Sequence, residues 1–341
     1  MNPAIRHAIV RGGLEATALF HSLGASVGGR GIIFTLHQVG PAADQAFHPN
    51  ALLSVTPQFL DQAIREVTRA GYEPVRLEDI PQRLAGGNDC RRFAAFTLDD
   101  GYRNNAEHAA PVFRRHGVPY TIFIAKGLTA RTRTIWWETA EALTRAADSF
   151  AFDFGNGRET VACATVGSKL AAYRRLAAFA GTFDEDEAVA RIDEAARAHG
   201  LDPRALVAER IMAADELAAL ACDPLCSLGA HTVTHCNLAR VSPERLRREI
   251  ADSVEAVAGW SGTRPRSFAY PYGWKGAAGP REAQAAADAG ISVAVTTQPG
   301  VIDADHLDRL TALPRVSLNG LYQKPRYVRA LMSGLPFRFV A

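Results

Sequence analysis

The chain has 341 residues, of which 48% are hydrophobic, enough for a large packed core. Its 38 Lys and Arg residues nearly balance its 36 Asp and Glu residues, and the basic residues occur in short scattered runs, which argues against nucleic acid as a partner. No stretch reaches the roughly 20 apolar residues of an integral membrane span. Five cysteines, an odd number in a chain too long to need disulfides, favour a reducing compartment, so we expect a cytoplasmic protein.

Apolar strands and amphipathic helices alternate in the first third of the chain. Residues 1–30 are predicted to form a helical lead, and 31–37 (GIIFTLH) have the composition of a buried strand. A helix is predicted over 56–71, with Thr56 as its N-cap and Gly71 as its stop. A short strand at 73–77, a strand at 92–100 (RFAAFTLDD), a helix at about 105–115 and a strand at 119–125 (PYTIFIA) complete this part.

The same alternation resumes after residue 215. The predicted elements are a strand at 226–232, a helix at 242–259, a strand at 267–273, a helix at 280–290 and a strand at 291–297. Apolar strands without polar alternation indicate a parallel α/β sheet with both faces covered. Residues from about 130 to 215 are rich in Ala, Glu and Arg and helical in pattern, and we interpret them as an insertion in a single barrel-like domain over 31–341.

Polar residues follow several of these strands at their carboxyl ends. They are His37, Asp99, Asp100, His231 and the turn at 270–273 (YPYG). In parallel α/β sheets, catalytic and ligand-binding residues usually lie at this edge. We therefore expect these residues to converge on one site.

His231 and His235, in HTVTH, have i, i+4 spacing. In a helix or a tight turn both imidazoles face the same way, and two imidazoles plus one carboxylate make a catalytic zinc site with an open position for water. Two surface histidines in a Thr-rich loop are the alternative. A second candidate for zinc, the trio Cys222, Cys226 and Cys236, matches the spacing of structural zinc ligands poorly.

Asp99 and Asp100 stand side by side where a predicted strand gives way to Gly101. Two ionised carboxylates in contact repel each other, and a metal ion would resolve that conflict. One of them could ligate the ion while the other takes a proton from a water that the ion activates. An Asp-Asp-Gly turn in which one carboxylate caps the following helix is the alternative.

Taken together, TLDDGYRNN (97–105) and HTVTH (231–235) resemble the first two motifs of the polysaccharide deacetylase family, the NodB-homology or carbohydrate esterase family 4 enzymes. FAYPYG (268–273) is similar to the third motif. The resemblance implies a distorted (β/α) barrel of the NodB type, here with a helical insertion. It also implies a hydrolase that uses a divalent metal, zinc above all, to remove N-acetyl groups from an amino-sugar polysaccharide or oligosaccharide. The expected partner is therefore an N-acetylated carbohydrate.

The resemblance implies a role for each matching residue. Asp99 would be the catalytic base, and Asp100, His231 and His235 would be the metal ligands. Tyr272 would offer its backbone N–H to the oxyanion, where such a donor commonly lowers a barrier by about 3 kcal/mol.

Two positions depart from the family pattern. The third motif normally carries an arginine that pairs with the base, but this chain has Ala269 there. We expect Arg315, in LPRVSL (313–318), to replace it, with an ordinary surface arginine as the alternative.

The usual C-terminal Leu-x-His strand is missing, and FTLHQVG (34–40) resembles it, as in circularly shifted exopolysaccharide deacetylases. His37 would then be the general acid, with a satisfied core histidine as the alternative.

Trp136 and Trp137, where the insertion begins, and Tyr272 are candidate substrate-binding residues, because flat aromatic faces suit sugar rings. For the two tryptophans, packing between insertion and barrel is the alternative.

Two other functions stay open. One is hydrolysis of another C–N bond, in a small or cyclic amide; the other is carbohydrate binding by a chain whose catalytic set has decayed, which the missing arginine at position 269 allows.

Overall fold

One curled sheet of eight parallel strands lies at the centre of the fold. The computed structural model describes residues 3–22, 29–42, 45–86 and 91–339. The strands are β1 Gly31–Leu36, β4 Glu73–Pro74, β5 Phe93–Leu98, β6 Tyr120–Ile124, β9 Cys226–Ala230, β10 Ser267–Ala269, β11 Val293–Val295 and β12 Val316–Ser317. Their order is β11-β10-β9-β6-β5-β1-β12, with β4 beside β5.

The central strands are buried on both faces, as the sequence predicts for a parallel sheet covered by helices. The register places Leu36 of β1 opposite Leu98 of β5, and Ile124 of β6 opposite Ala230 of β9. Because these strands are parallel and end at the same level, the loops that follow them leave the sheet at one shared edge.

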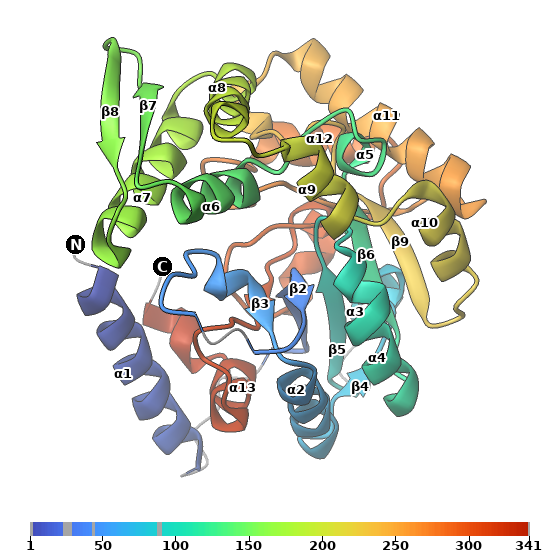
Figure 1. Cartoon of the computed structure of the whole chain (residues 1–341). Helices are drawn as coiled ribbons and strands as arrows, with labels where there is room; N and C mark the ends of the chain where they lie inside the picture. Colours follow the sequence, from blue (N-terminus) through green and yellow to red (C-terminus); the bar gives the residue numbers. More distant parts are fainter. Residues whose placement is uncertain (1–2, 23–28, 43–44, 87–90, 340–341) are drawn as a thin grey trace.

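Helices pack on both faces of the sheet (Figure 1). Those on the outer face are α2 Pro57–Arg69, α4 Ala110–His116, α11 Pro243–Ser261, α12 Pro280–Asp288 and α13 Pro325–Met332. α3 Ile80–Ala85 packs on the opposite face, and α5 Lys126–Thr129 packs with residues of the insertion. The predicted N-cap of α2 is present, because the Thr56 hydroxyl accepts a hydrogen bond from the Phe59 N–H at 3.2 Å. Successive residues of β1 pack into two different apolar cores. Ile32 and Phe34 belong to the larger core, and Ile33 belongs to a second core on the opposite face of the sheet.

Residues 313–317 connect the two ends of the curled sheet. Leu313 forms a parallel bridge with Val295 of β11, and Val316 pairs with Phe34 of β1. The same short segment therefore contains the strand at one end of the sheet, β12, and contacts the strand at the other end, β11. This arrangement confirms the predicted α/β fold with a distorted parallel barrel, and it brings the C-terminal part of the chain beside the N-terminal strand.

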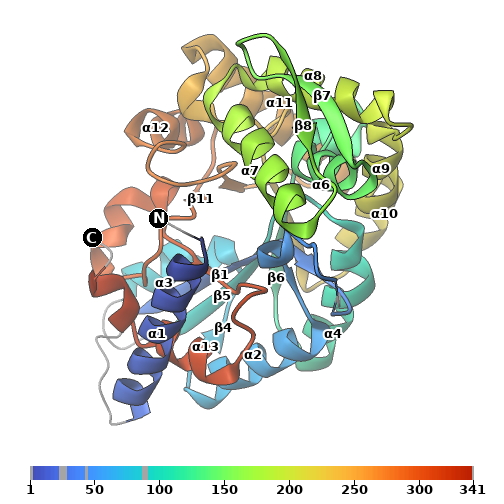
Figure 2. The ribbon, with the colours of Figure 1, turned by 60° about the vertical axis from the view of Figure 1, so that its left-hand side comes forward.

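The segment predicted as a helical insertion lies above the carboxyl edge of the sheet (Figures 1 and 2). Its helices are α6 Trp136–Ala146, α7 Val166–Thr182, α8 Glu185–Ala198, α9 Pro203–Arg210 and the start of α10 Ala214–Ala221. An apolar core of its own holds α6, α7, α8 and the hairpin described next together.

The expectation of a wholly helical insertion is wrong at one place. Residues 149–162 form an antiparallel hairpin of β7 Ser149–Asp153 and β8 Arg158–Ala162. Exposed and buried residues alternate along β7, which is the period of a strand, and Gly155 and Gly157 supply the positive φ angles of the turn.

Outside the main sheet, α1 Pro3–Ser22 lies along α13, and β2 Gln38–Val39 pairs with β3 Ser54–Val55. The rest of the predicted 1–30 lead lies partly outside the described residues. Among the helices that the structure describes, none is long and apolar enough to cross a bilayer.

Candidate active site

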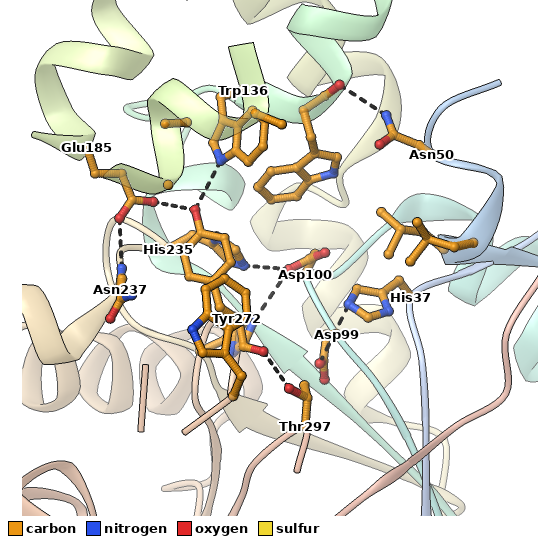
Figure 3. Close-up of a pocket in the computed structure, with 18 of the residues that line it drawn as sticks. His37, Asn50, Asp99, Asp100, Trp136, Glu185, His235, Asn237, Tyr272 and Thr297 are labelled. Atoms are coloured by element: carbon orange, nitrogen blue, oxygen red, sulfur yellow. Dashed lines mark hydrogen bonds and ion pairs between the residues drawn. The ribbon is translucent and has the colours of Figure 1, made fainter. Parts of the chain in front are cut away.

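The predicted site residues meet in one pocket at the carboxyl edge of the sheet (Figure 3). The cavity measures about 410 Å³ and lies between this edge and the insertion. His37, Asp99, Asp100, Trp136, Trp137, His231, His235 and Tyr272 all line it. Arg315 lies beneath the pocket and is 1% exposed.

Asp99 and Asp100 follow β5 but face different partners. The Asp99 N–H donates to the Leu36 carbonyl at 3.0 Å, which ties the end of β5 to β1. Asp100 has a φ of 73°, in the left-handed region that residues other than glycine seldom adopt. The chain therefore turns sharply between the two carboxylates, and Asp99 faces Arg315 while Asp100 faces two imidazoles.

Asp100, His231 and His235 form the one cluster of three candidate metal ligands among the described residues. The Nε2 atoms of His231 and His235 lie 3.4 Å and 3.2 Å from Oδ1 of Asp100. That oxygen is buried and forms no hydrogen bond within the described chain, so it is an acceptor that a cation would satisfy. One carboxylate and two imidazoles are the donor set of a catalytic divalent metal site, and these residues fit one.

The charges of this cluster support each other. Burial alone would raise the pKa of Asp100, but the imidazoles of His231 and His235 outweigh it and hold that pKa well below its usual range. Burial opposes charge on His235 as well, yet the Asp100 carboxylate raises the pKa of this imidazole. An ionised Asp100 is the form that binds a cation.

The loop that carries the histidines is a tight turn and not a helix. Thr232 and His235 have φ angles of 66° and 54°, and the Thr232 hydroxyl accepts a hydrogen bond from the His235 N–H at 2.9 Å. Nδ1 of His231 lies 2.6 Å from the Ala269 carbonyl oxygen, which can only accept. Nδ1 therefore carries a proton, and Nε2 is the nitrogen that faces Asp100.

Glu249 of α11 holds this loop, although no sequence motif marks it as a site residue. Its Oε2 accepts the N–H groups of Val233 and Thr234 at 2.9 Å each, and its Oε1 accepts the Thr234 hydroxyl at 2.7 Å. A signal was present: Glu249 lies beside Ile250 and three residues after Leu246, on the apolar face of a predicted helix. A carboxylate at such a position is seldom buried unless it is paired.

Arg315 and Asp99 form a buried, two-pronged ion pair. Nη1 and Nη2 of Arg315 each donate to one carboxylate oxygen of Asp99 at 2.7 Å. Nε and Nη1 also donate to the Thr296 carbonyl at 2.8 Å and the Thr97 hydroxyl at 3.0 Å. Burial would raise the pKa of Asp99, but the guanidinium outweighs it and holds that pKa below its usual value. The alternative of a surface arginine is excluded.

His37 stands beside the base. Its Nε2 lies 3.9 Å from Oδ2 of Asp99, beyond direct hydrogen-bond distance, and its side chain is 25% exposed. Burial lowers the pKa of His37, and the nearby aspartates oppose this only in part. Asn105 Nδ2 donates to the His37 carbonyl at 2.8 Å from a π-helical turn, Asn105–Ala109, with which the predicted 105–115 helix begins.

Tyr272 lies where the predicted 267–273 strand has already ended, at Ala269. Its φ is 64°, and its carbonyl accepts the Thr297 hydroxyl at 2.6 Å. Its phenol donates to Glu185 and accepts the Trp136 indole N–H at 3.0 Å. Burial, aided by the Glu185 carboxylate, raises the pKa of Tyr272 well above its usual range. Glu185 was also missed, because nothing in the sequence connects the insertion to this turn.

The two tryptophans lie differently. Trp136 is half-buried at the pocket, with its indole N–H on the Tyr272 phenol. Trp137 is 7% exposed and packs its ring against His235, with 4.9 Å between ring centroids. Its N–H donates to the Tyr102 hydroxyl at 2.8 Å. Trp137 therefore packs against a candidate metal ligand. This position fits the alternative of packing between insertion and barrel better than a role in binding a sugar ring.

Backbone strain gathers at this pocket. Five non-glycine residues of the described chain have positive φ angles, and four of them belong to the site: Asp100, Thr232, His235 and Tyr272. Such conformations cost on the order of 1–3 kcal/mol each and cluster at functional sites, where surrounding contacts enforce them. This pattern points to the same pocket independently of the sequence motifs.

Fold and site thus define a class: curled parallel α/β proteins with a buried Asp-His-His cluster beside an arginine-paired aspartate. Residues 182–294 match the model of the polysaccharide deacetylase family, a range that includes His231, His235 and Tyr272 but not the aspartate pair. Over this range the chain is similar to the polysaccharide deacetylases, as its motifs predict.

Solved structures with similar folds include deacetylase PplD of Streptococcus pyogenes in complex with acetate, at 17% identity and a TM-score of 0.55, covering 86% of this chain and 94% of that one. IcaB from Ammonifex degensii gives 15% identity and a TM-score of 0.52, covering 86% and 93%. The BpsB deacetylase domain of Bordetella bronchiseptica gives 16% and 0.50, covering 84% and 94%. A search of curated proteins finds no match.

Proposed function

We propose that this chain is a metal-dependent deacetylase that removes N-acetyl groups from an amino-sugar polysaccharide or oligosaccharide. One observation carries the proposal: two adjacent aspartates face different partners, Arg315 and an imidazole pair, within a single pocket. The family match and the folds of the neighbours support it. The Arg315 contact argues against a decayed catalytic set, because Asp99 has an arginine partner although position 269 supplies none.

Asp100, His231 and His235 would hold the ion, and zinc suits this set of ligands. When bound, a divalent metal supplies Lewis acidity, which polarises the acetyl carbonyl and lowers the pKa of water toward ~7. The hydrogen bond from His231 to the Ala269 carbonyl would keep one imidazole in the tautomer that ligation requires.

The remaining steps belong to groups of this protein's own chain. Asp99 would accept the proton of the attacking water, and Arg315 would keep that carboxylate ionised and fixed in direction. The Tyr272 N–H would donate to the developing oxyanion. His37 would protonate the leaving amine, and Trp136 would offer an aromatic face to the sugar.

Acetate release tests this function directly. The zinc-loaded protein should release acetate from chitooligosaccharides or poly-N-acetylglucosamine, and a chelator should abolish the release until zinc is restored. Acetate release from none of these sugars by a protein with stoichiometric metal would refute the sugar deacetylase, and a panel of small and cyclic amides would then be the next substrates.

The domain division is part of the same proposal. We take residues 31–341 as one barrel domain with an insertion at about 130–215, and residues 1–30 as a helical lead. The separate apolar core of the insertion supports that division. A cytoplasmic location stays a proposal that rests on the odd number of cysteines.

A further inference from the structure

We infer that the insertion completes the catalytic site: Glu185 and Trp136 are positioning residues for Tyr272. The inference rests on the proposed function, in which the Tyr272 backbone N–H stabilises the oxyanion. It concerns contacts between the insertion and the barrel that no motif predicts.

Two hydrogen bonds connect the insertion to the Tyr272 side chain and fix it in place (Figure 3). The phenol donates to Oε1 of Glu185, the first residue of α8, and accepts the indole N–H of Trp136, the first residue of α6, at 3.0 Å. Oε2 of Glu185 accepts the Asn237 N–H at 2.8 Å, so the carboxylate is itself held by the barrel. The N-terminal turn of a helix also favours a negative charge at this position.

The barrel holds the main chain of the same residue. The Thr297 hydroxyl donates to the Tyr272 carbonyl at 2.6 Å, and the Thr297 N–H donates to the Gly273 carbonyl at 3.0 Å. A Cβ on Gly273 would come within 2.5 Å of the Thr297 nitrogen, so this close approach requires glycine. Hydrogen bonds thus hold Tyr272 at two points: the barrel binds its carbonyl, and the insertion binds its phenol.

Because the backbone of Tyr272 is strained, the contact between its phenol and the insertion affects the position of its N–H. Its φ of 64° is a conformation that persists only when surrounding contacts enforce it. A donor to an oxyanion must be placed within about 0.5 Å and 10–20° of the productive geometry. Release of the phenol would let the turn relax and swing the N–H away from the reacting carbonyl.

Direct contact of Glu185 with the sugar is the competing explanation, and the hydrogen bonds disfavour it. Both carboxylate oxygens already accept protein donors. A residue that binds substrate affects KM, whereas a residue that aligns an oxyanion donor affects kcat, because its interaction exists only in the transition state. The two explanations therefore differ in a measurable way.

Steady-state kinetics of the zinc-loaded protein on one N-acetylated oligosaccharide provides the test. Tyr272→Phe removes the phenol and leaves the main chain intact, and Glu185→Ala removes its acceptor. Each should lower kcat roughly 10-fold, a fraction of the loss on removing a whole donor, with KM within about twofold and zinc content unchanged. The double variant should be no slower than either single variant, because both break the same contact.

Glu187→Ala is the matched control, since it removes a carboxylate from the same turn of α8. Glu187 pairs with Arg191 and lies away from the pocket residues, so kcat should stay at the wild-type value. A readout independent of activity is available because the chain has four tryptophans. The indole N–H resonance of Trp136, assigned with Trp136→Phe, should move in Tyr272→Phe and stay in Glu187→Ala.

The outcomes separate the two proposals. An active wild type whose Glu185→Ala variant changes KM alone, or changes nothing, overturns the inference and leaves the deacetylase intact. An unmoved Trp136 resonance in Tyr272→Phe overturns it as well. A wild type that releases no acetate overturns the proposed function together with the role inferred for the insertion.

Discussion

At the scale of single residues, the buried pair of Asp99 and Arg315 is the feature that distinguishes this site. The two residues are 216 positions apart, and the guanidinium binds both carboxylate oxygens in a pocket floor with almost no exposure. Separating such a pair leaves one charge buried and unpaired, which costs far more than the intact pair contributes.

Arg315→Met should therefore lower the free energy of unfolding by about 3–5 kcal/mol, because Asp99 loses its only guanidinium partner in the described structure. Adding Asp99→Asn should restore a large part of the loss, since the second change removes the orphaned charge. Urea unfolding of the wild type, the two single variants and the double variant measures this. Equal losses in Arg315→Met and the double variant would contradict the buried-charge argument.

At this scale, a site residue could be predicted from the sequence only where it belongs to a short motif. Asp99, Asp100, His231 and His235 could be recognised because each pair lies within one short motif. Arg315 could be named only as a candidate, since no local pattern separates a buried arginine from a surface one. Glu185 could not be found at all, because the contact that gives it a place in the site joins two segments that the sequence does not relate.

At the scale of elements, α11 fixes the histidine loop through one buried carboxylate. Glu249 is 4% exposed and accepts three hydrogen bonds from Val233 and Thr234. The loop it holds contains two residues with positive φ, which need such support. The orientation of the candidate metal ligands thus depends on a helix that supplies no ligand.

Glu249→Ala should weaken zinc binding about 10–100-fold, as expected for loss of a group that orients metal ligands. Glu255→Ala on the same helix is its control, because Glu255 is 65% exposed and pairs with Arg264 at the surface. Competition with a chromophoric chelator gives the affinity of both variants. Wild-type affinity in Glu249→Ala would show that the loop holds its shape without the carboxylate.

Element boundaries were predictable where hydrophobic pattern and turn residues agreed, as at α2. They failed where a polar or strained turn interrupts an apolar run: the 267–273 strand stops at Ala269 because residues 270–273 turn away with Tyr272 and Gly273 at positive φ. The β7–β8 hairpin was missed because an Ala-, Glu- and Arg-rich surrounding favoured helix over the two-residue period of Phe150 and Phe152.

At the scale of the whole molecule, closure of the sheet assembles the site. Residues 313–317 lie against both β11 and β1, so Arg315 is brought under β5 by the same segment that joins the sheet ends. The parallel α/β class follows from apolar strands alternating with helices. The strand order does not, because it depends on which of many similar apolar strands pack side by side.

The N-terminal helix is attached to the opposite end of the chain by an acid-sensitive contact. Glu15 of α1 accepts hydrogen bonds from Arg326 Nε at 2.8 Å and from the Tyr327 phenol at 2.5 Å, both on α13. These contacts, that with Arg326 above all, lower the pKa of Glu15 from 4.5 to about 2. A lowered carboxyl pKa contributes stability that is present above its ordinary value and is lost as the pH falls.

Hydrogen exchange of the α1 amides should therefore report progressive loss of protection as the pH falls from 4.5 toward about 2. The dependence should be much weaker in Glu15→Gln, whose side chain does not titrate. Protection factors corrected for intrinsic exchange at each pH give the comparison. The same acid dependence in both proteins would show that other carboxylates release the helix.

The division of labour between Asp99 and Asp100 is tested most directly by zinc content and acetate release measured together on Asp99→Asn and Asp100→Asn. Asp99→Asn should keep stoichiometric zinc and lose about 10²–10⁴-fold in kcat, the contribution of a general base. Asp100→Asn should lose the zinc itself. An Asp99→Asn protein that is active at full zinc occupancy, or an Asp100→Asn protein that retains zinc at wild-type affinity, would contradict the assignment.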